Sequence, residues 1–150
     1  MKRTLIAVFV VFVVWTVVDF VVQGVILAPA YTTTPQLWRP LEEIKAGVMN
    51  FMVLIAAASF VLIYAWLINE KSVKTAVKYG VLYGIGMGIT MAYGSYSTMP
   101  LSAGIAFWWF TGRLIEAVAA GWLIGLIVRK QRKNNWVPFG MRERGDYIKY

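Results

Sequence analysis

Apolar residues fall into four long runs, and short polar stretches separate them. The runs cover approximately residues 5–28, 47–68, 76–96 and 105–128. Each is close to the ~20 residues that an α-helix needs to cross about 30 Å of hydrocarbon. Soluble helical bundles show apolar stripes instead of unbroken apolar runs. The pattern therefore predicts an all-α fold, an integral membrane bundle of four transmembrane helices.

The polar stretches define the predicted domain organisation. Residues 1–133 form the transmembrane domain, and residues 134–150 form a cytoplasmic tail. Ala28-Pro29-Ala30 resembles a signal-peptide cleavage site, but the apolar run before it is too long and contains Asp19. We therefore expect the first run to be retained as a helix.

The distribution of Lys and Arg predicts the orientation. These residues gather before the first run, between the second and third, and after the fourth, whereas the opposite side holds Arg39, Lys45 and Arg113. The positive-inside rule then places both termini in the cytoplasm and the protein in the inner (cytoplasmic) membrane. Four basic residues that follow the last run are expected to contact anionic lipid headgroups. They are Arg129, Lys130, Arg132 and Lys133.

A short internal similarity leaves a further architectural alternative open. Tyr31-Thr32-Thr33-Thr34-Pro35 aligns with Tyr96-Ser97-Thr98-Met99-Pro100, and each segment follows an odd-numbered run. Two helical hairpins related by a pseudo-twofold axis along the membrane normal would give such a repeat.

Composition narrows the chemistry. The chain is 59% hydrophobic and 15% charged, against about 45–50% and 25% in soluble domains. It contains neither Cys nor His, which removes disulfides, thiol catalysis and Cys/His metal or haem sites. We expect no metal, no cofactor and no enzymatic activity. The net charge of +8 lies beside the apolar runs, which favours a lipid surface over nucleic acid.

Small residues recur along the last two runs. Such ladders let membrane helices pack with their backbones in contact, because lipid provides no hydrophobic drive for association. The opposite side of the fourth run carries Ile115, Val118, Trp122 and Leu126, which we expect to face lipid. The predicted helix-packing residues are Gly80, Gly84, Gly88, Ala117, Gly121 and Gly125.

Polar residues within the runs share a depth, near the end opposite to the termini. A charged side chain at a helix centre costs about 2.5–3.5 kcal/mol on insertion scales. Residues this costly are expected to face the bundle interior and to meet as one polar cluster that opens outward. The predicted members are Asp19, Gln23, Asn50, Tyr93, Tyr96, Arg113 and Glu116.

Three interpretations of this cluster remain open. In the structural one, Arg113 pairs with Glu116 one turn on, and Asp19 hydrogen-bonds Tyr and Asn groups. The second is a proton or ion path through Glu116 and Asp19. The third is a pocket for a lipid or quinone-like ligand walled by Tyr93, Tyr96 and Trp108.

The structural interpretation leads to the function we expect first: a non-catalytic accessory or structural subunit, or a self-associating bundle, whose partners are other membrane subunits or itself. A proton-coupled small-molecule transporter or channel is the alternative, and the ligand pocket is the third.

Two segments together resemble an uncharacterised group of small bacterial four-helix inner-membrane proteins. The first is Tyr31-x-x-Thr34-x-x-Leu37-Trp38-Arg39-Pro40. The second begins at Met99-Pro100 and continues with Trp109-x-x-Gly112-x-x-x-Glu116-x-x-x-x-Gly121-x-x-x-Gly125. The resemblance covers the four runs and implies their topology. It implies no activity, but it draws attention to Arg39 and Glu116 as positions within its pattern. The candidate residues of the outer loop are Tyr31, Trp38 and Arg39.

Overall fold

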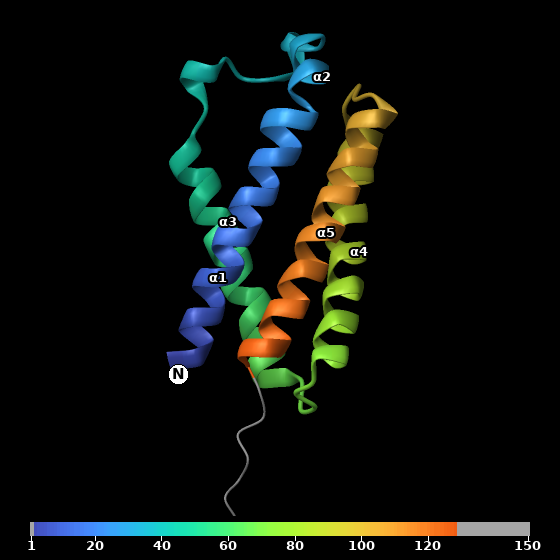
Figure 1. The fold of residues 1–150 in the computed structure, drawn as a ribbon. Helices are drawn as coiled ribbons and strands as arrows, with labels where there is room; N and C mark the ends of the chain where they lie inside the picture. Colours follow the sequence, from blue (N-terminus) through green and yellow to red (C-terminus); the bar gives the residue numbers. More distant parts are fainter. Residues whose placement is uncertain (1, 129–150) are drawn as a thin grey trace, which may run out of the picture.

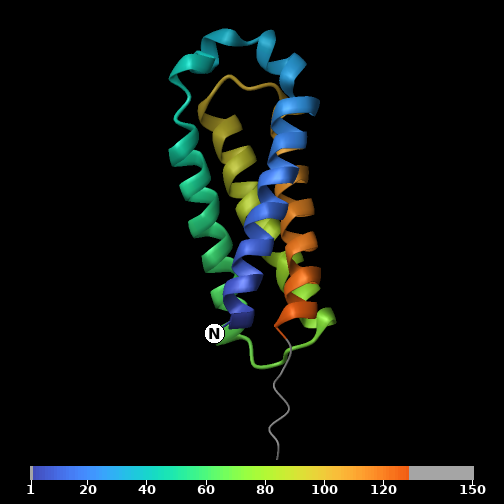
Figure 2. The same cartoon turned by 60° about the vertical axis from the view of Figure 1, so that its left-hand side comes forward.

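The structure is a computed structural model that describes residues 2–128. The long helical rods of the chain lie side by side in Figures 1 and 2. Their helices are α1 (Lys2–Asp19) continued by the π-helix η1 (Phe20–Ile26), α3 (Ala46–Leu62) continued by the π-helix η4 (Ile63–Leu67), α4 (Val73–Thr98) and α5 (Ala103–Ile127). Three short helices join the first two rods: α2 (Ala28–Thr32), η2 (Pro35–Leu37) and η3 (Leu41–Glu43). We call this the α2 end of the bundle and the opposite end the Lys2 end.

The helical class predicted from the sequence is confirmed, with no strand in residues 2–128. Three helices are long and apolar enough to cross a membrane: Lys2–Ile26, Ala46–Leu67 and Ala103–Ile127. They match three of the four predicted spans to within a few residues. The fourth rod, α4, is the longest helix at 26 residues but is not among those three. Its first turns carry Lys74 and Lys78, and its last turns carry Ser95, Ser97 and Thr98.

Helices α4 and α5 pack with their backbones in contact. A Cβ atom on Gly80 would lie 2.3 Å from the carbonyl oxygen of Ala117, and one on Gly121 would lie 2.5 Å from that of Ala76. Real Cβ atoms do not approach an oxygen so closely, so only glycine fits at these two positions. This main-chain contact supplies the van der Waals packing on which helix association in lipid depends.

The same interface continues along both helices. A Cβ atom added to Gly84 would lie 2.9 Å from the Ala117 Cβ atom. One added to Gly88 would lie 3.0 Å from a ring carbon of Phe110, and one added to Gly125 would lie 2.8 Å from the Val73 Cα atom. The structure thus places all six small residues highlighted in the sequence at the α4–α5 interface. On the far side of α5, Ile115 and Trp122 are 50% and 53% exposed.

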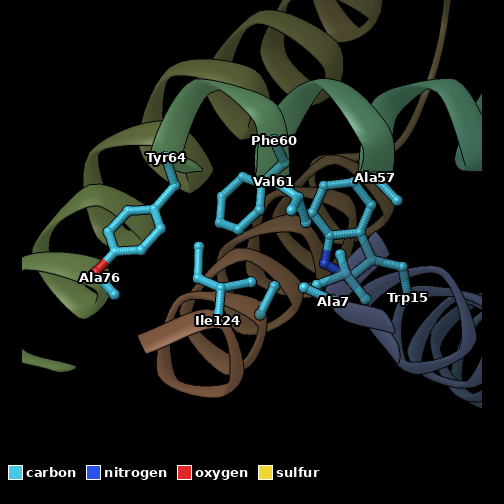
Figure 3. Close-up of a cluster of buried hydrophobic side chains, with 10 residues drawn as sticks. Ala7, Trp15, Ala57, Phe60, Val61, Tyr64, Ala76 and Ile124 are labelled. Carbon is cyan, nitrogen blue, oxygen red and sulfur yellow. The ribbon is translucent and has the colours of Figure 1, made fainter. Parts of the chain in front are cut away.

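An aromatic core joins all four rods near the Lys2 end (Figure 3). The Trp15 ring lies 5.5 Å from the Phe60 ring, and Phe60 stacks on Tyr79 at 4.7 Å. The Tyr79 hydroxyl donates to the Phe60 carbonyl oxygen at 3.0 Å. Small side chains such as Ala7 and Ala57 let the helices approach around these rings.

A lysine closes the carboxyl end of the α3–η4 rod. The Lys71 ammonium group donates to the carbonyl oxygens of Tyr64, Ala65 and Ile68, and it lies 4.8 Å from the centre of the Tyr64 ring. The last carbonyl groups of a helix lack intrahelical donors, and a cation there is favourable. Lys71 therefore fixes the start of the loop that leads into α4.

The bundle is uncovered between α3 and α4 at the α2 end. Figure 1 shows α3 diverging from α4 in that direction. Every residue of α3 from Ala46 to Met52 is exposed. In α4, the only buried residues after Gly84 are Gly88 and Ala92, and Gly88 faces α5. We call the exposed parts of these two segments, residues 46–52 and 85–98, the open half.

The two hairpins of the suggested internal repeat differ in the structure. The α1–α3 hairpin is joined by α2, η2 and η3, whereas residues 99–102 suffice between α4 and α5. Close backbone packing holds α4 on α5, while α3 buries Ala57, Phe60 and Val61 only. In both hairpins the first helix runs toward the α2 end and the second helix returns (Figure 1), but the two helices pack differently in each hairpin.

Candidate functional site: a polar seam between α1 and α5

Polar side chains meet along the contact between α1 and α5, in three successive layers. The two helices run antiparallel (Figure 1), so residues later in the first rod lie beside residues earlier in α5. The innermost layer is a hydrogen bond of 2.9 Å from the Trp15 indole nitrogen to the Glu116 carbonyl oxygen. This bond fixes the height of α5 against α1.

The middle layer consists of charged side chains. The Arg113 guanidinium donates through Nη2 to Asp19 Oδ1 at 2.6 Å and through Nη1 to Glu116 Oε2 at 2.7 Å. Glu116 is 2% exposed, while the side chains of Arg113 and Asp19 are each 23% exposed. We call these three residues the ion cluster. It connects α1 to α5 through two charge-assisted hydrogen bonds, the stronger kind in proteins.

The backbone changes where Asp19 enters the ion cluster. Asp19 is the last α-helical residue of its rod, and the π-helix η1 begins at Phe20. Val22 of η1 is buried against Gly112 of α5, where an added Cβ atom would lie 3.3 Å from the valine methyl groups. Short π-helical turns within α-helices are frequent at functional sites. Gly112 thus lets η1 stay close to α5 just beyond the ion cluster.

The outermost layer joins η1, α2 and α5 through one hydroxyl group. The Tyr31 hydroxyl donates to the Gln23 amide oxygen and accepts from the Trp109 indole nitrogen at 2.8 Å. The Tyr31 ring lies 4.7 Å from that of Trp38, whose indole nitrogen donates to Thr34. Burial raises the pKa of Tyr31 above its ordinary value of 10.0, so the hydroxyl keeps its donor proton across the neutral range.

Removing this hydroxyl tests the outermost layer. Tyr31→Phe is expected to lower the free energy of unfolding by about 1–3 kcal/mol, because the Gln23 amide and the Trp109 indole both lose their hydrogen-bond partner. Hydrogen exchange of residues 28–45 should accelerate while the α4–α5 interface stays protected. The control is Tyr96→Phe, because the Tyr96 side chain is 45% exposed. Equal exchange in the two variants would contradict a linking role for Tyr31.

The predicted polar residues do not all gather in one place. Asp19, Arg113 and Glu116 meet directly, and Gln23 lies in the next layer with Tyr31. Asn50 is exposed on α3, and Tyr93 and Tyr96 are 44% and 45% exposed on α4. Arg113 holds both carboxylates, whereas the structural interpretation had paired it with Glu116 alone.

Other highlighted positions have different surroundings. Trp38 is half-buried under the α2 connection, where its ring also lies 6.1 Å from Trp109, and Arg39 is exposed. The basic residues Arg129, Lys130, Arg132 and Lys133 lie outside the described residues. Trp15 and Trp109 were not among the predicted site residues. Their spacing of four residues from Asp19 and from Arg113 is the signal that could have included them.

The polar contacts of this site are hydrogen bonds and ion pairs. In the part of the chain that the structure describes, no three His, Cys, Asp or Glu residues gather as metal ligands. Within the same residues, no buried side-chain nitrogen or oxygen atom lacks a partner. A shallow apolar groove lined by Leu62, Ile63 and Trp66 lies on the other half of the bundle, away from the ion cluster.

Comparison with known proteins adds no relative. No protein-family model, no curated protein and no solved structure matches this chain. The resemblance noted in the sequence therefore stays a prediction. The fold and the seam define the class: an all-helical protein with three helices suited to crossing a membrane, two of which are joined by a polar seam.

Proposed function

We propose that this chain is a non-catalytic structural subunit of the inner membrane that self-associates through its open half. In this proposal all four rods cross the bilayer and both termini are cytoplasmic. Helix α4 has 26 residues, about 39 Å at 1.5 Å per residue, and lies alongside the three apolar rods (Figure 2). A helix of this length in that position supports a fourth span.

The distribution of charge supports the proposed orientation. Lys74 and Lys78 lie with the amino terminus at the Lys2 end, and both are exposed. At the α2 end, Arg39 and Lys45 are offset by the acidic pair in η3. An excess of Lys and Arg marks the cytoplasmic side of membrane proteins. The Lys2 end would then contact anionic headgroups.

The uncovered face of α4 is the observation that carries the proposal. Gly86, Thr90 and Gly94 recur every fourth residue on the open half, and all three are exposed. A Cβ atom added to Gly86 or Gly94 would have nothing within 4 Å. The Thr90 hydroxyl donates to the Gly86 carbonyl oxygen at 2.8 Å, so the stretch presents a surface of small groups that a neighbouring backbone can approach. A second helix packed there would cover them, as small residues do in transmembrane interfaces.

A second copy is the simplest partner for this face. Most oligomers are homo-oligomers, and a twofold interface places the same patch of both subunits in contact. Two α4 helices crossing at Thr90 would bring Gly86 and Gly94 of each against the other backbone. The neighbouring exposed segment of α3, which includes Asn50, would lie beside this crossing.

Cysteine crosslinking tests the proposal, and the chain contains no native Cys. Oxidation of a Thr90→Cys variant in its own membrane is expected to give a product of twice the chain mass. Trp122→Cys is the matched control, because Trp122 is exposed on the lipid-facing side of α5. Equal background from the two variants would contradict self-association. A Thr90→Cys product of another mass would replace the second copy by a different subunit.

A further inference from the structure

We propose that the ion cluster is a proton-binding site that holds one exchangeable proton on its two carboxylates. The inference is independent of self-association and rests on the number and placement of charges between α1 and α5. One guanidinium, that of Arg113, faces two carboxylates, those of Asp19 and Glu116. If both carboxylates were ionised, the cluster would carry a net charge of minus one.

The surrounding helices provide no second cation. From α1 the titratable group at this level is Asp19, and from α5 the groups are Arg113 and Glu116. Helix α4 presents Tyr83, which stacks on Trp15 at 6.4 Å, and Tyr31 lies one layer further out. Helix α3 has no titratable residue between Ala46 and Leu62. Neutral tyrosines do not balance a carboxylate, so a proton is the remaining means of neutralisation.

Burial makes that neutralisation necessary. Glu116 is 2% exposed, and water cannot solvate its charge. An isolated buried carboxylate becomes neutral when no opposite charge is available. Arg113 can balance one carboxylate, and in the proposal one proton neutralises the other charge of the pair. The geometry accommodates this state, because each carboxylate uses one oxygen atom toward Arg113 and keeps another for the proton.

Partial exposure makes the proton exchangeable. The side chains of Asp19 and Arg113 are each 23% exposed, in contrast to 3% for Glu116. In the proposal a proton enters or leaves on the Asp19 side of the cluster, the side that the helices leave partly uncovered. The site would bind one proton per chain, and its occupancy would decide whether the seam is neutral or negative.

Infrared spectroscopy of the protein in lipid nanodiscs tests the proposal. The wild-type chain at neutral pH is expected to show the carbonyl stretch of one protonated carboxylic acid. The band should disappear in Glu116→Gln, and also in Asp19→Asn, because either change leaves one carboxylate for one guanidinium. Glu42→Gln and Glu70→Gln are the controls, since both acids are exposed in the connections.

Each result has a defined meaning, provided that circular dichroism shows the native helix content. No band in the wild-type protein would overturn the proposal. A band that persists in Asp19→Asn would also overturn it, because protonation would then not depend on the count of charges. Loss of the band in both variants, with the controls unchanged, would support a single proton shared by the cluster.

Discussion

Gly80→Ala is expected to destabilise the bundle by about 1–3 kcal/mol, the usual cost of overpacking a well-packed interface. The new methyl group would lie 2.3 Å from the Ala117 carbonyl oxygen, and neither backbone can yield without moving a whole helix. Alanine favours a helix over glycine by about 1 kcal/mol, so the intrinsic preference acts in the opposite direction. A net loss would therefore measure the steric conflict between α4 and α5.

Gly104→Ala is the matched control, since the same change on the exposed start of the neighbouring helix α5 meets only the Ser102 hydroxyl oxygen, at an ordinary contact distance of 3.9 Å. This variant should be as stable as the wild-type protein or slightly more stable. Unfolding by sodium dodecyl sulfate in mixed micelles, followed by circular dichroism, gives both free energies. If Gly80→Ala were as stable as Gly104→Ala, the backbone contact would not hold α4 on α5.

Arg113→Gln is expected to cost about 3–5 kcal/mol, the range found when one partner of a buried ion pair is removed. Both carboxylates of the seam would lose their cation together. The double variant Asp19→Asn/Glu116→Gln should be similarly unstable, because it leaves the guanidinium without a carboxylate. Asp19→Asn alone and Glu116→Gln alone each keep one balanced ion pair. Each should lower the free energy of unfolding by about 1 kcal/mol, the usual contribution of one hydrogen bond.

The wild-type protein, the two single variants Asp19→Asn and Glu116→Gln, and their double variant form a double-mutant cycle. The cost of the double variant should exceed the sum of the single costs by about 1–3 kcal/mol, a coupling typical of residues in one network. The same detergent unfolding measures all four proteins. Additive costs would mean that Arg113 does not hold the two carboxylates as one unit.

The amino-acid sequence predicts the helical rods because apolar runs of ~20 residues have few other solutions in lipid. The faces of α5 also follow from spacing: Glu116 and Gly121 are buried, while Ile115 and Trp122 are exposed. The helical rods and the faces of α5 are both predicted from the spacing of apolar and polar residues within one segment, so no knowledge of the neighbouring helices is needed.

The grouping of polar residues could not be predicted in the same way. Depth alone placed Asn50, Tyr93 and Tyr96 with the ion cluster, but shared depth does not bring two helices together. Helix α3 diverges from α4 (Figure 1), and all three residues are exposed. The π-helix at Phe20–Ile26 has no clear sequence signal either, so the bonding of Gln23 with Tyr31 depends on tertiary structure.

The glycine interface also bears on how the chain enters a bilayer during synthesis. Helix α4 alone is not among the helices apolar enough to cross a membrane, so it would be a poor substrate for insertion by itself. Only residues 99–102 separate it from α5, and the two backbones are in contact at Gly80 and Gly121. If α4 crosses the bilayer, as proposed, it would enter lipid together with α5 as one hairpin.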